Sequence, residues 1–167
     1  MKTDEEYMQL ALIEAQKAYD LGEIPIGAIL VDEGGAIVAS GHNLRESNHD
    51  ATAHAEIEVI QQACSQLARW RLSGLTIYVT IEPCAMCAGA LVNSRVSRLV
   101  YGSPDSKAGG VESIFNIVNH RLLNHRMEVT AGVMAEECRQ IMKDFFAMRR
   151  KQNKARRQAE KLATTES

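Results

Sequence analysis

The stretch Glu82-Pro83-Cys84-Ala85-Met86-Cys87 organises this chain, because two cysteines three residues apart at the start of a helix can form half of a metal site. Pro83 suits the first helical position, since it lacks the N–H that would be unpaired there. We expect Cys84 and Cys87 to project from one face of the first turn, where the helix dipole favours thiolates, the form that binds metal. Residues 75–81 alternate with the period of a strand and lead directly into this motif.

The other half of the predicted site lies upstream, where His54 and Glu56 form a His-x-Glu motif. One His and two Cys ligands leave the fourth tetrahedral position of zinc open for water, as in catalytic sites. Zinc lowers the pKa of such a water to about 7, so a nucleophile is available at neutral pH. We expect Thr52 to cap the helix that carries both residues, and Glu56 to move protons between the water and a substrate nitrogen.

Two other readings of these four residues are a structural metal site and a redox Cys-x-x-Cys pair. A structural zinc needs a fourth ligand, and a redox pair has no need of His-x-Glu, so the pattern favours a catalytic site. The remaining cysteines, Cys64 and Cys138, lie on apolar helical stripes and are predicted to be core residues.

The 167 residues are 46% hydrophobic and 24% charged, values typical of one globular domain. The longest apolar run, residues 26–31, is far too short to span a bilayer, and the acidic start lacks the apolar run of a signal peptide. These features predict a soluble cytoplasmic protein with no membrane partner, in which cysteines stay reduced.

Charge is unevenly distributed along the chain. Residues 143–167 hold 8 basic and 3 acidic side chains, a local charge of +5, while the remainder holds 11 basic and 18 acidic ones, a charge of −7. A basic end on an acidic body suggests a polyanionic partner, and the alternative is a solvated helix end. We expect residues 1–150 to form the catalytic domain and residues 151–167 to form a basic helical extension or tail.

Periodicity predicts the remaining elements. Helices are expected over 8–22, 54–70, 84–93 and from Met134 onward, with a short one over 114–118, and strands over 24–31, 36–42, 75–81, 96–101 and 127–131. This order predicts an α/β fold, a mixed sheet of about five strands with helices on both faces. Sites in such sheets lie at the carboxyl ends of strands, where His54 and Cys84 both fall.

Several stretches besides the zinc motif resemble bacterial tRNA-specific adenosine deaminases, of the cytidine/deoxycytidylate deaminase superfamily. They are Ile24-Pro25-Ile26-Gly27-Ala28, His54-Ala55-Glu56-Ile57, Tyr78-Val79-Thr80-Ile81-Glu82-Pro83-Cys84, Asn124-His125-Arg126 and Asp144-Phe145-Phe146. The resemblance implies a three-layer, cytidine-deaminase-like α/β/α sandwich with a mixed five-stranded sheet. It also implies a homodimer whose substrate contacts both subunits.

By the same resemblance, His54, Cys84 and Cys87 bind one Zn²⁺ per subunit and Glu56 is the catalytic proton shuttle. The implied substrate-binding residues are Asn43, Asp105, Ser106, Lys107, Asn119, His120, Arg126, Phe145, Phe146, Arg149 and Arg150. Asn43 would hydrogen-bond the flipped target nucleoside. Phe146 lies one residue off the apolar stripe of its helix, which makes it the better stacking candidate of the two phenylalanines.

The implied activity is zinc-dependent hydrolytic conversion of adenosine to inosine at the wobble position of a tRNA anticodon, with the anticodon stem-loop as partner. One alternative is a free-base or nucleoside deaminase acting on guanine or cytidine, which would not need the basic last helix. A zinc-stabilised RNA-binding module without catalysis is another. Glu56 and the missing fourth ligand argue against that module.

Overall fold

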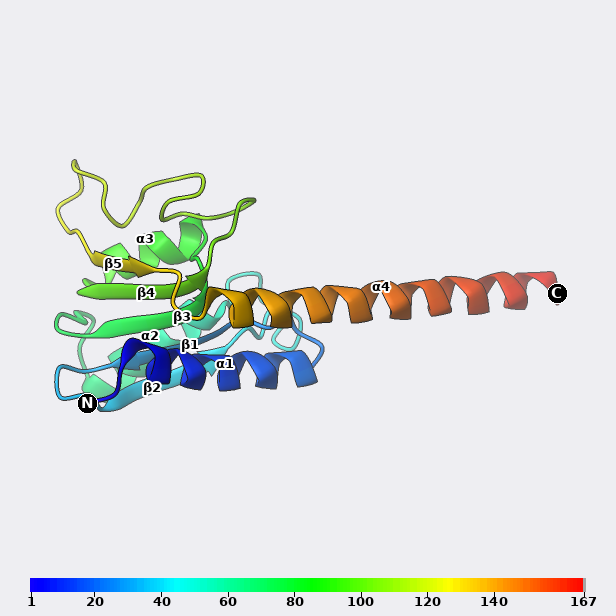
Figure 1. The fold of residues 1–167 in the computed structure, drawn as a ribbon, viewed down its shortest axis with the longest axis horizontal. Coiled ribbons are helices and arrows are strands. Elements are labelled where there is room, and N and C mark those ends of the chain that lie inside the picture. Colours follow the sequence, from blue (N-terminus) through cyan, green and yellow to red (C-terminus); the bar gives the residue numbers. More distant parts are fainter. Residues whose placement is uncertain (167) are drawn as a thin grey trace.

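The computed structural model describes residues 1–166, and Ser167, the last residue of the predicted tail, lies outside the described residues. The elements, in chain order, are α1 (Asp4–Asp20), β1 (Gly27–Val31), β2 (Ile37–His42), α2 (Ala55–Leu67), β3 (Thr76–Ile81), α3 (Ala85–Asn93), β4 (Arg98–Ser103), β5 (Glu128–Ala131) and α4 (Ala135–Thr165) (Figure 1).

The strands form one mixed sheet in the order β2-β1-β3-β4-β5. Strand β1 is antiparallel to both β2 and β3, whereas β3, β4 and β5 run parallel. The parallel pairing of β3 with β4 follows from the β3–α3–β4 connection, which returns the chain to the same end of the sheet. The predicted mixed five-stranded sheet is confirmed, as is the edge position of its last strand.

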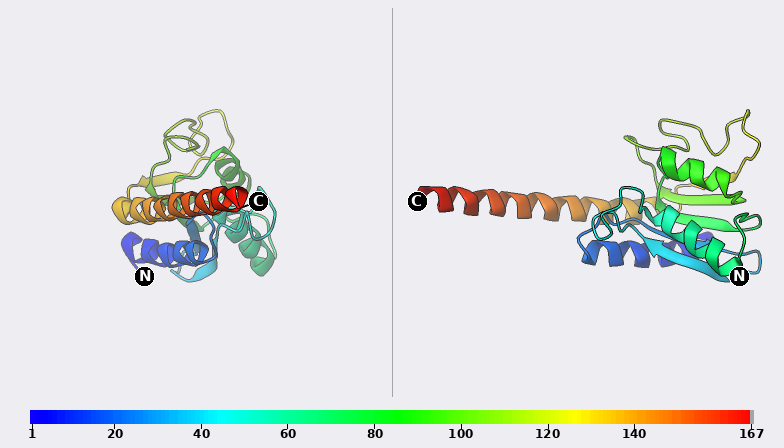
Figure 2. Two further views of the ribbon diagram at one scale, coloured as in Figure 1. Left: turned by 90° about the vertical axis from the view of Figure 1, so that its right-hand side faces the viewer. Right: turned by 180° about the vertical axis from the view of Figure 1, so that it is seen from behind.

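Helices cover both faces of the sheet, with α2 and α3 on one face and α1 and α4 on the other (Figure 2). The alternation along β1 explains this layering. Ala28 and Leu30 pack in the core beneath α2 and α3, whereas Ile29 and Val31 pack in the core beneath α1. Among the described helices, none is both long and apolar enough to cross a membrane.

Two predicted helical segments differ in the structure. The short helix expected over 114–118 is wrong, because the N–H groups of Ile114 and Phe115 both donate to the carbonyl of Gly109, which closes an irregular loop in place of a helical ladder. Helix α2 ends at Leu67, earlier than expected. Ala68 takes a left-handed conformation there and ends the helix by donating to carbonyls of the last turn.

One buried carboxylate holds the long segment between β4 and β5. Glu82 is 2% exposed, and its carboxylate accepts hydrogen bonds from the N–H groups of residues 111–113 and of Asp105. Burial alone would raise the pKa of Glu82, but these donors and the Ser113 hydroxyl outweigh it and lower the pKa to about 2. A side chain at Gly109 would collide with this carboxylate, since its Cβ would overlap Oε2 of Glu82.

We predict that Glu82→Gln lowers the free energy of unfolding by up to about 3 kcal/mol at pH 7, because the mutant loses the charge that these donors surround. The folded-state pKa is depressed, so the wild-type advantage should be complete above pH 4.5, shrink as the pH falls toward 2, and vanish below it. Urea unfolding of the metal-free proteins across this pH range measures the effect. Glu46→Gln, at an exposed carboxylate, is the control; equal losses in the two variants would contradict the prediction.

Candidate metal and catalytic site

Three donor atoms converge where α2 and α3 begin. The Nδ1 atom of His54 lies 3.7 Å from Sγ of Cys84 and 3.6 Å from Sγ of Cys87, and all three donor atoms lie within 4.8 Å of one another. In a tetrahedral zinc site with ordinary bond lengths, a nitrogen and a sulfur ligand are about 3.6 Å apart. The donor set therefore fits zinc in both chemistry and spacing.

The helix starts differ from prediction by one or two residues. His54 itself is the N-cap of α2 and Cys84 the N-cap of α3, so Pro83 precedes the helix and does not occupy its first position. Thr52 does not cap α2, because its hydroxyl donates to the carboxylate of Asp50 at 2.7 Å. Two ligands thus occupy positions at which the unpaired N–H groups and positive dipole ends of two helices favour anionic sulfur.

The two thiols have opposite pKa shifts. The hydrogen bond with Cys87 lowers the pKa of Cys84 to about 4, despite partial burial, with help from His54. The same hydrogen bond, together with burial, raises the pKa of Cys87 far above its usual range. The hydrogen bond to Cys84 raises the pKa of His54. A divalent cation in this position would stabilise both sulfurs as thiolates.

Glu56 lies in the first turn of α2 and is 4% exposed. Burial raises the pKa of this carboxyl to about 7, with a smaller contribution from the charge of Cys84, and against the opposing effects of a hydrogen bond from its own backbone N–H and of His54. A carboxyl with a pKa near neutrality can accept a proton in one step and return it in the next. The arrangement therefore supplies a proton-transfer group beside the donor set.

A cavity of about 510 Å³ lies at the carboxyl ends of β3 and β4, where Ile81 and Ser103 line it; the donor residues themselves are not among its lining residues. It is lined by Ile24, Ile26, Arg45, Ile81, Ser103, Pro104, Asp105, Ser106, Lys107, Ala108, Arg139, Met142 and Phe146. The lining combines aliphatic and aromatic side chains with three cations, a composition suited to a flat base that carries phosphate groups.

The 105–107 loop lines this cavity, whereas Asn43 lies behind its lining and is hydrogen-bonded to two residues that do line it. Asn43 is buried after β2, and its side chain donates to the carbonyl of Ile24 at 3.3 Å and accepts from the N–H of Arg45 at 3.1 Å. Asp105 accepts the N–H groups of Lys107 and Ala108, which shapes the loop, and leaves Ser106 and Lys107 exposed at the rim.

The predicted residues on α4 divide into anchors and exposed side chains. Phe145 is buried against Tyr19, with ring centroids 5.6 Å apart, and Arg149 donates to the carbonyl of Gly22. Phe146 is 41% exposed and lines the cavity, and Arg150 is exposed. Phe146 is therefore available to stack on a base, whereas Phe145 holds the helix in place.

Three predicted residues lie elsewhere. His120 accepts the N–H of Leu122, Arg126 donates to the carbonyl of Arg121 at 2.6 Å, and Asn119 lies beside the start of β5. Their segment adjoins the amino ends of β4 and β5, because Glu128 donates to the carbonyl of Ser97 (Figure 1). Within one chain, these residues are not brought to the cavity.

Sequence reasoning missed several side chains around the cavity. Arg139 and Met142 line it together with Phe146, and their spacing of three and seven residues, typical of one helix face, was the available signal. Glu23 was also missed: its buried carboxylate accepts the N–H groups of Glu46 and Ser47, which orders the loop after Asn43. Nothing near Glu23 in the sequence indicates these partners.

Comparisons with known proteins place this chain among deaminases. A family model described as MafB19-like deaminase matches residues 2–150. The tRNA-specific adenosine deaminase of Bacillus subtilis (strain 168) is 49% identical, with 94% of this chain and 97% of that protein covered. The protein of the same name from Haemophilus influenzae is 47% identical, with 90% and 87% covered.

Solved structures agree. A chain from a study of A-to-I editing by tRNA:A34 deaminases at the wobble position of transfer RNA has a TM-score of 0.78 and 43% identity, covering 81% of this chain and 98% of that one. Guanine deaminase from Nitrosomonas europaea has a TM-score of 0.78 at 22% identity, covering 88% and 86%, a likeness of fold alone. The donor set, the fold and these identities over nearly full length together show that the chain belongs to the tRNA-specific adenosine deaminase family.

Proposed function

We propose that this protein is a zinc-dependent hydrolase that converts adenosine to inosine at the wobble position of a tRNA anticodon. The observation that carries the proposal is the three-residue donor set with the buried carboxyl of Glu56 beside it; a cavity with three cations in its lining lies at the same edge of the sheet. Family membership supports the substrate, since the curated relatives are named tRNA-specific adenosine deaminases. The protein would act in the cytoplasm.

In this proposal, His54, Cys84 and Cys87 hold one zinc per subunit, which when bound supplies the Lewis acidity that makes water nucleophilic at neutral pH. Glu56 takes a proton from the attacking water, delivers it to N1 of the adenine and then assists the departing amine. Water adds at C6 and the bond from C6 to the exocyclic nitrogen breaks. Adenosine and water thus give inosine and ammonia.

The cavity explains how one base of an RNA could reach the site. Asn43 orients the target nucleoside, Asp105, Ser106 and Lys107 hold the neighbouring nucleotides, and Phe146 stacks on a base. The target base must be turned out of the RNA, which costs little in a single-stranded anticodon loop. We assign this work to residues 1–150 and treat residues 151–167 as a separate basic extension.

A homodimer would allow the remaining predicted residues to contact the RNA. Asn119, His120 and Arg126 lie away from their own cavity, so they would contact RNA bound in the cavity of a second subunit. Their segment also exposes apolar side chains that a partner could cover: Ile114 at 48%, Phe115 at 53%, Leu122 at 76% and Leu123 at 42%.

We predict about one zinc per chain, held by the proposed ligands. Cys84→Ala should lose the metal, because two ligands bind zinc far more weakly than three. Cys64→Ala should keep it, because that sulfur donates to the carbonyl of Trp70 and lies outside the donor set. Elemental analysis of the purified proteins measures both. Loss of zinc from the Cys64 variant with retention in the Cys84 variant would show that the ligand set is wrong.

The zinc-loaded protein should form inosine in an anticodon stem-loop and leave free adenine, guanine and cytidine unchanged. Glu56→Gln should keep zinc and fold yet lose at least about 10²–10⁴-fold in turnover, because the amide cannot transfer the proton. Glu58→Gln, two residues further along α2, is the matched control and should retain activity. Chromatography of each reaction product decides the matter, and turnover of a free base in place of RNA would reassign the substrate.

Sedimentation of the zinc-loaded protein should give the mass of two chains. Phe115→Lys should shift it toward one chain, because the exposed ring would be replaced by a charge within the proposed interface. Trp70→Lys, which changes an equally exposed aromatic residue on another segment, should leave the mass unchanged. A Phe115 variant that remains fully dimeric would place the interface elsewhere.

A further inference from the structure

The last part of α4 is a helix without tertiary support. Every described residue from Arg150 to Glu166 is exposed, and the helix projects from the body at the end where the parallel strands finish (Figure 1). The described residues of the basic extension, 151–166, together with Arg150 just before them, hold six basic and two acidic residues, a charge of +4, whereas the rest of the chain holds 13 basic and 19 acidic residues, a charge of −6.

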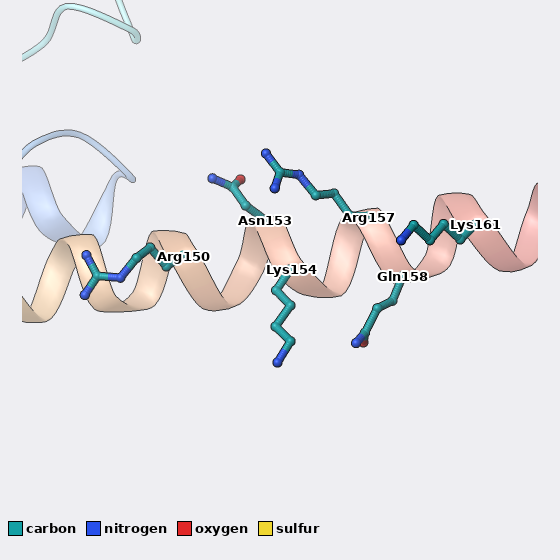
Figure 3. A pocket seen from close by; sticks show the side chains of 6 residues that line it. All are labelled: Arg150, Asn153, Lys154, Arg157, Gln158 and Lys161. Carbon is teal, nitrogen blue, oxygen red and sulfur yellow. The ribbon is translucent and has the colours of Figure 1, made fainter.

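Arg150 and three cations of the extension form one row, which we call the cation stripe. It consists of Arg150, Lys154, Arg157 and Lys161, whose side chains border one surface of the helix together with Asn153 and Gln158 (Figure 3). At about 100° per residue, the four positions fall within an arc of about 60°. The described residues supply no carboxylate partner to the stripe, whereas Arg156, on another face, lies 3.8 Å from Glu160.

The cation stripe lowers the stability of an isolated helix, because its like charges repel one another. Its members are spaced by four, three and four residues, the spacings at which like charges repel on a helix surface. No core contact compensates, because all four residues are exposed. Such a row is stabilised only when negative charges lie along it.

The stripe continues the face of α4 that lines the cavity. Arg139 and Phe146 line the cavity, and with the four cations they fall within an arc of about 80°. The helix extends about 22 Å from Phe146 to Lys161, and the stripe itself is about 16 Å long. The stripe and the cavity-lining residues of α4 therefore lie along one continuous face of the helix.

We propose that the cation stripe binds phosphates of the double-helical stem of the RNA arm whose loop carries the target adenosine. This inference rests on the proposed function. It adds that the stripe recognises a separate part of the RNA, the stem, while the cavity takes the loop. A straight row of cations needs phosphates that stay in a row over a similar length. One strand of a duplex offers them, whereas the backbone of a hairpin loop reverses direction.

The test compares two RNAs that share one loop, the first closed by a five-pair stem and the second by a two-pair stem. Three proteins are compared: the wild type, a stripe variant (Lys154→Gln with Lys161→Gln), and a relocation variant that adds Ala155→Lys and Ala159→Lys to those changes. The added lysines restore the net charge on the opposite side of the helix, about 130–170° away. The rate of inosine formation gives kcat and KM. Binding constants measured over a salt series give the salt slope, which is the change in log binding constant with log salt concentration.

On the five-pair RNA, both variants should raise KM roughly tenfold at 0.1 M salt with kcat unchanged, and should reduce the salt slope by about 1.4–1.8. On the two-pair RNA, all three proteins should behave alike. Phe146→Ala, by contrast, should weaken the binding of both RNAs equally, because Phe146 lines the cavity that receives the shared loop.

Three outcomes would overturn the inference. A relocation variant that binds like the wild type would show that net charge alone matters. Equal losses on both RNAs would place the stripe on the loop. A change in sedimenting mass with unchanged KM would assign the stripe to the acidic body of a second copy. Absence of inosine from wild-type reactions would instead refute the proposed function, while the binding slopes would still report on the stripe.

Discussion

The structure depends on two helices that begin at the same point. His54 and Cys84 occupy the N-caps of α2 and α3, so each of these donor residues also marks the start of a helix. The positive ends of both helices face the donor set and favour anionic sulfur there. The loop after β4 is joined to the same point, because Gly110 donates to the carbonyl of Pro83 at 2.7 Å. Helices, loop and ligands therefore constrain one another.

Three buried carboxylates near the site have different environments and different roles. Glu82 and Glu23 accept several N–H groups, which outweigh the effect of burial and lower the pKa of each. They order the loop after β4 and the loop after Asn43, two sides of the region around the cavity. Burial dominates at Glu56, so its pKa is raised. The same residue type thus orders two loops and provides the group that we propose transfers protons.

Patterns that are local in sequence allowed the sheet, the helices and the donor set to be predicted. The hairpin of β1 and β2, the β3–α3–β4 unit and the motif from Cys84 to Cys87 all depend on neighbours along the chain. The segment 104–127 was less predictable, because its hydrogen bonds reach back to Glu82 and not to the next turn of a helix. The cavity was hidden for a similar reason, since its lining comes from several separate segments.

Helix α4 is continuous from Ala135 to Thr165, which restricts the insertions and deletions that it can accept. A continuous helix joins Phe146 at the cavity to Lys161 near the end, so every residue between them sets both a distance and an angle. Insertion of a single residue would turn the outer part of the helix by about 100°, whereas seven residues would lengthen it by about 10 Å and nearly restore its orientation. If the cation stripe has the role that we propose, lineages that lengthen or shorten this helix are expected to do so in steps of whole turns, so that Phe146 and the stripe stay on one face.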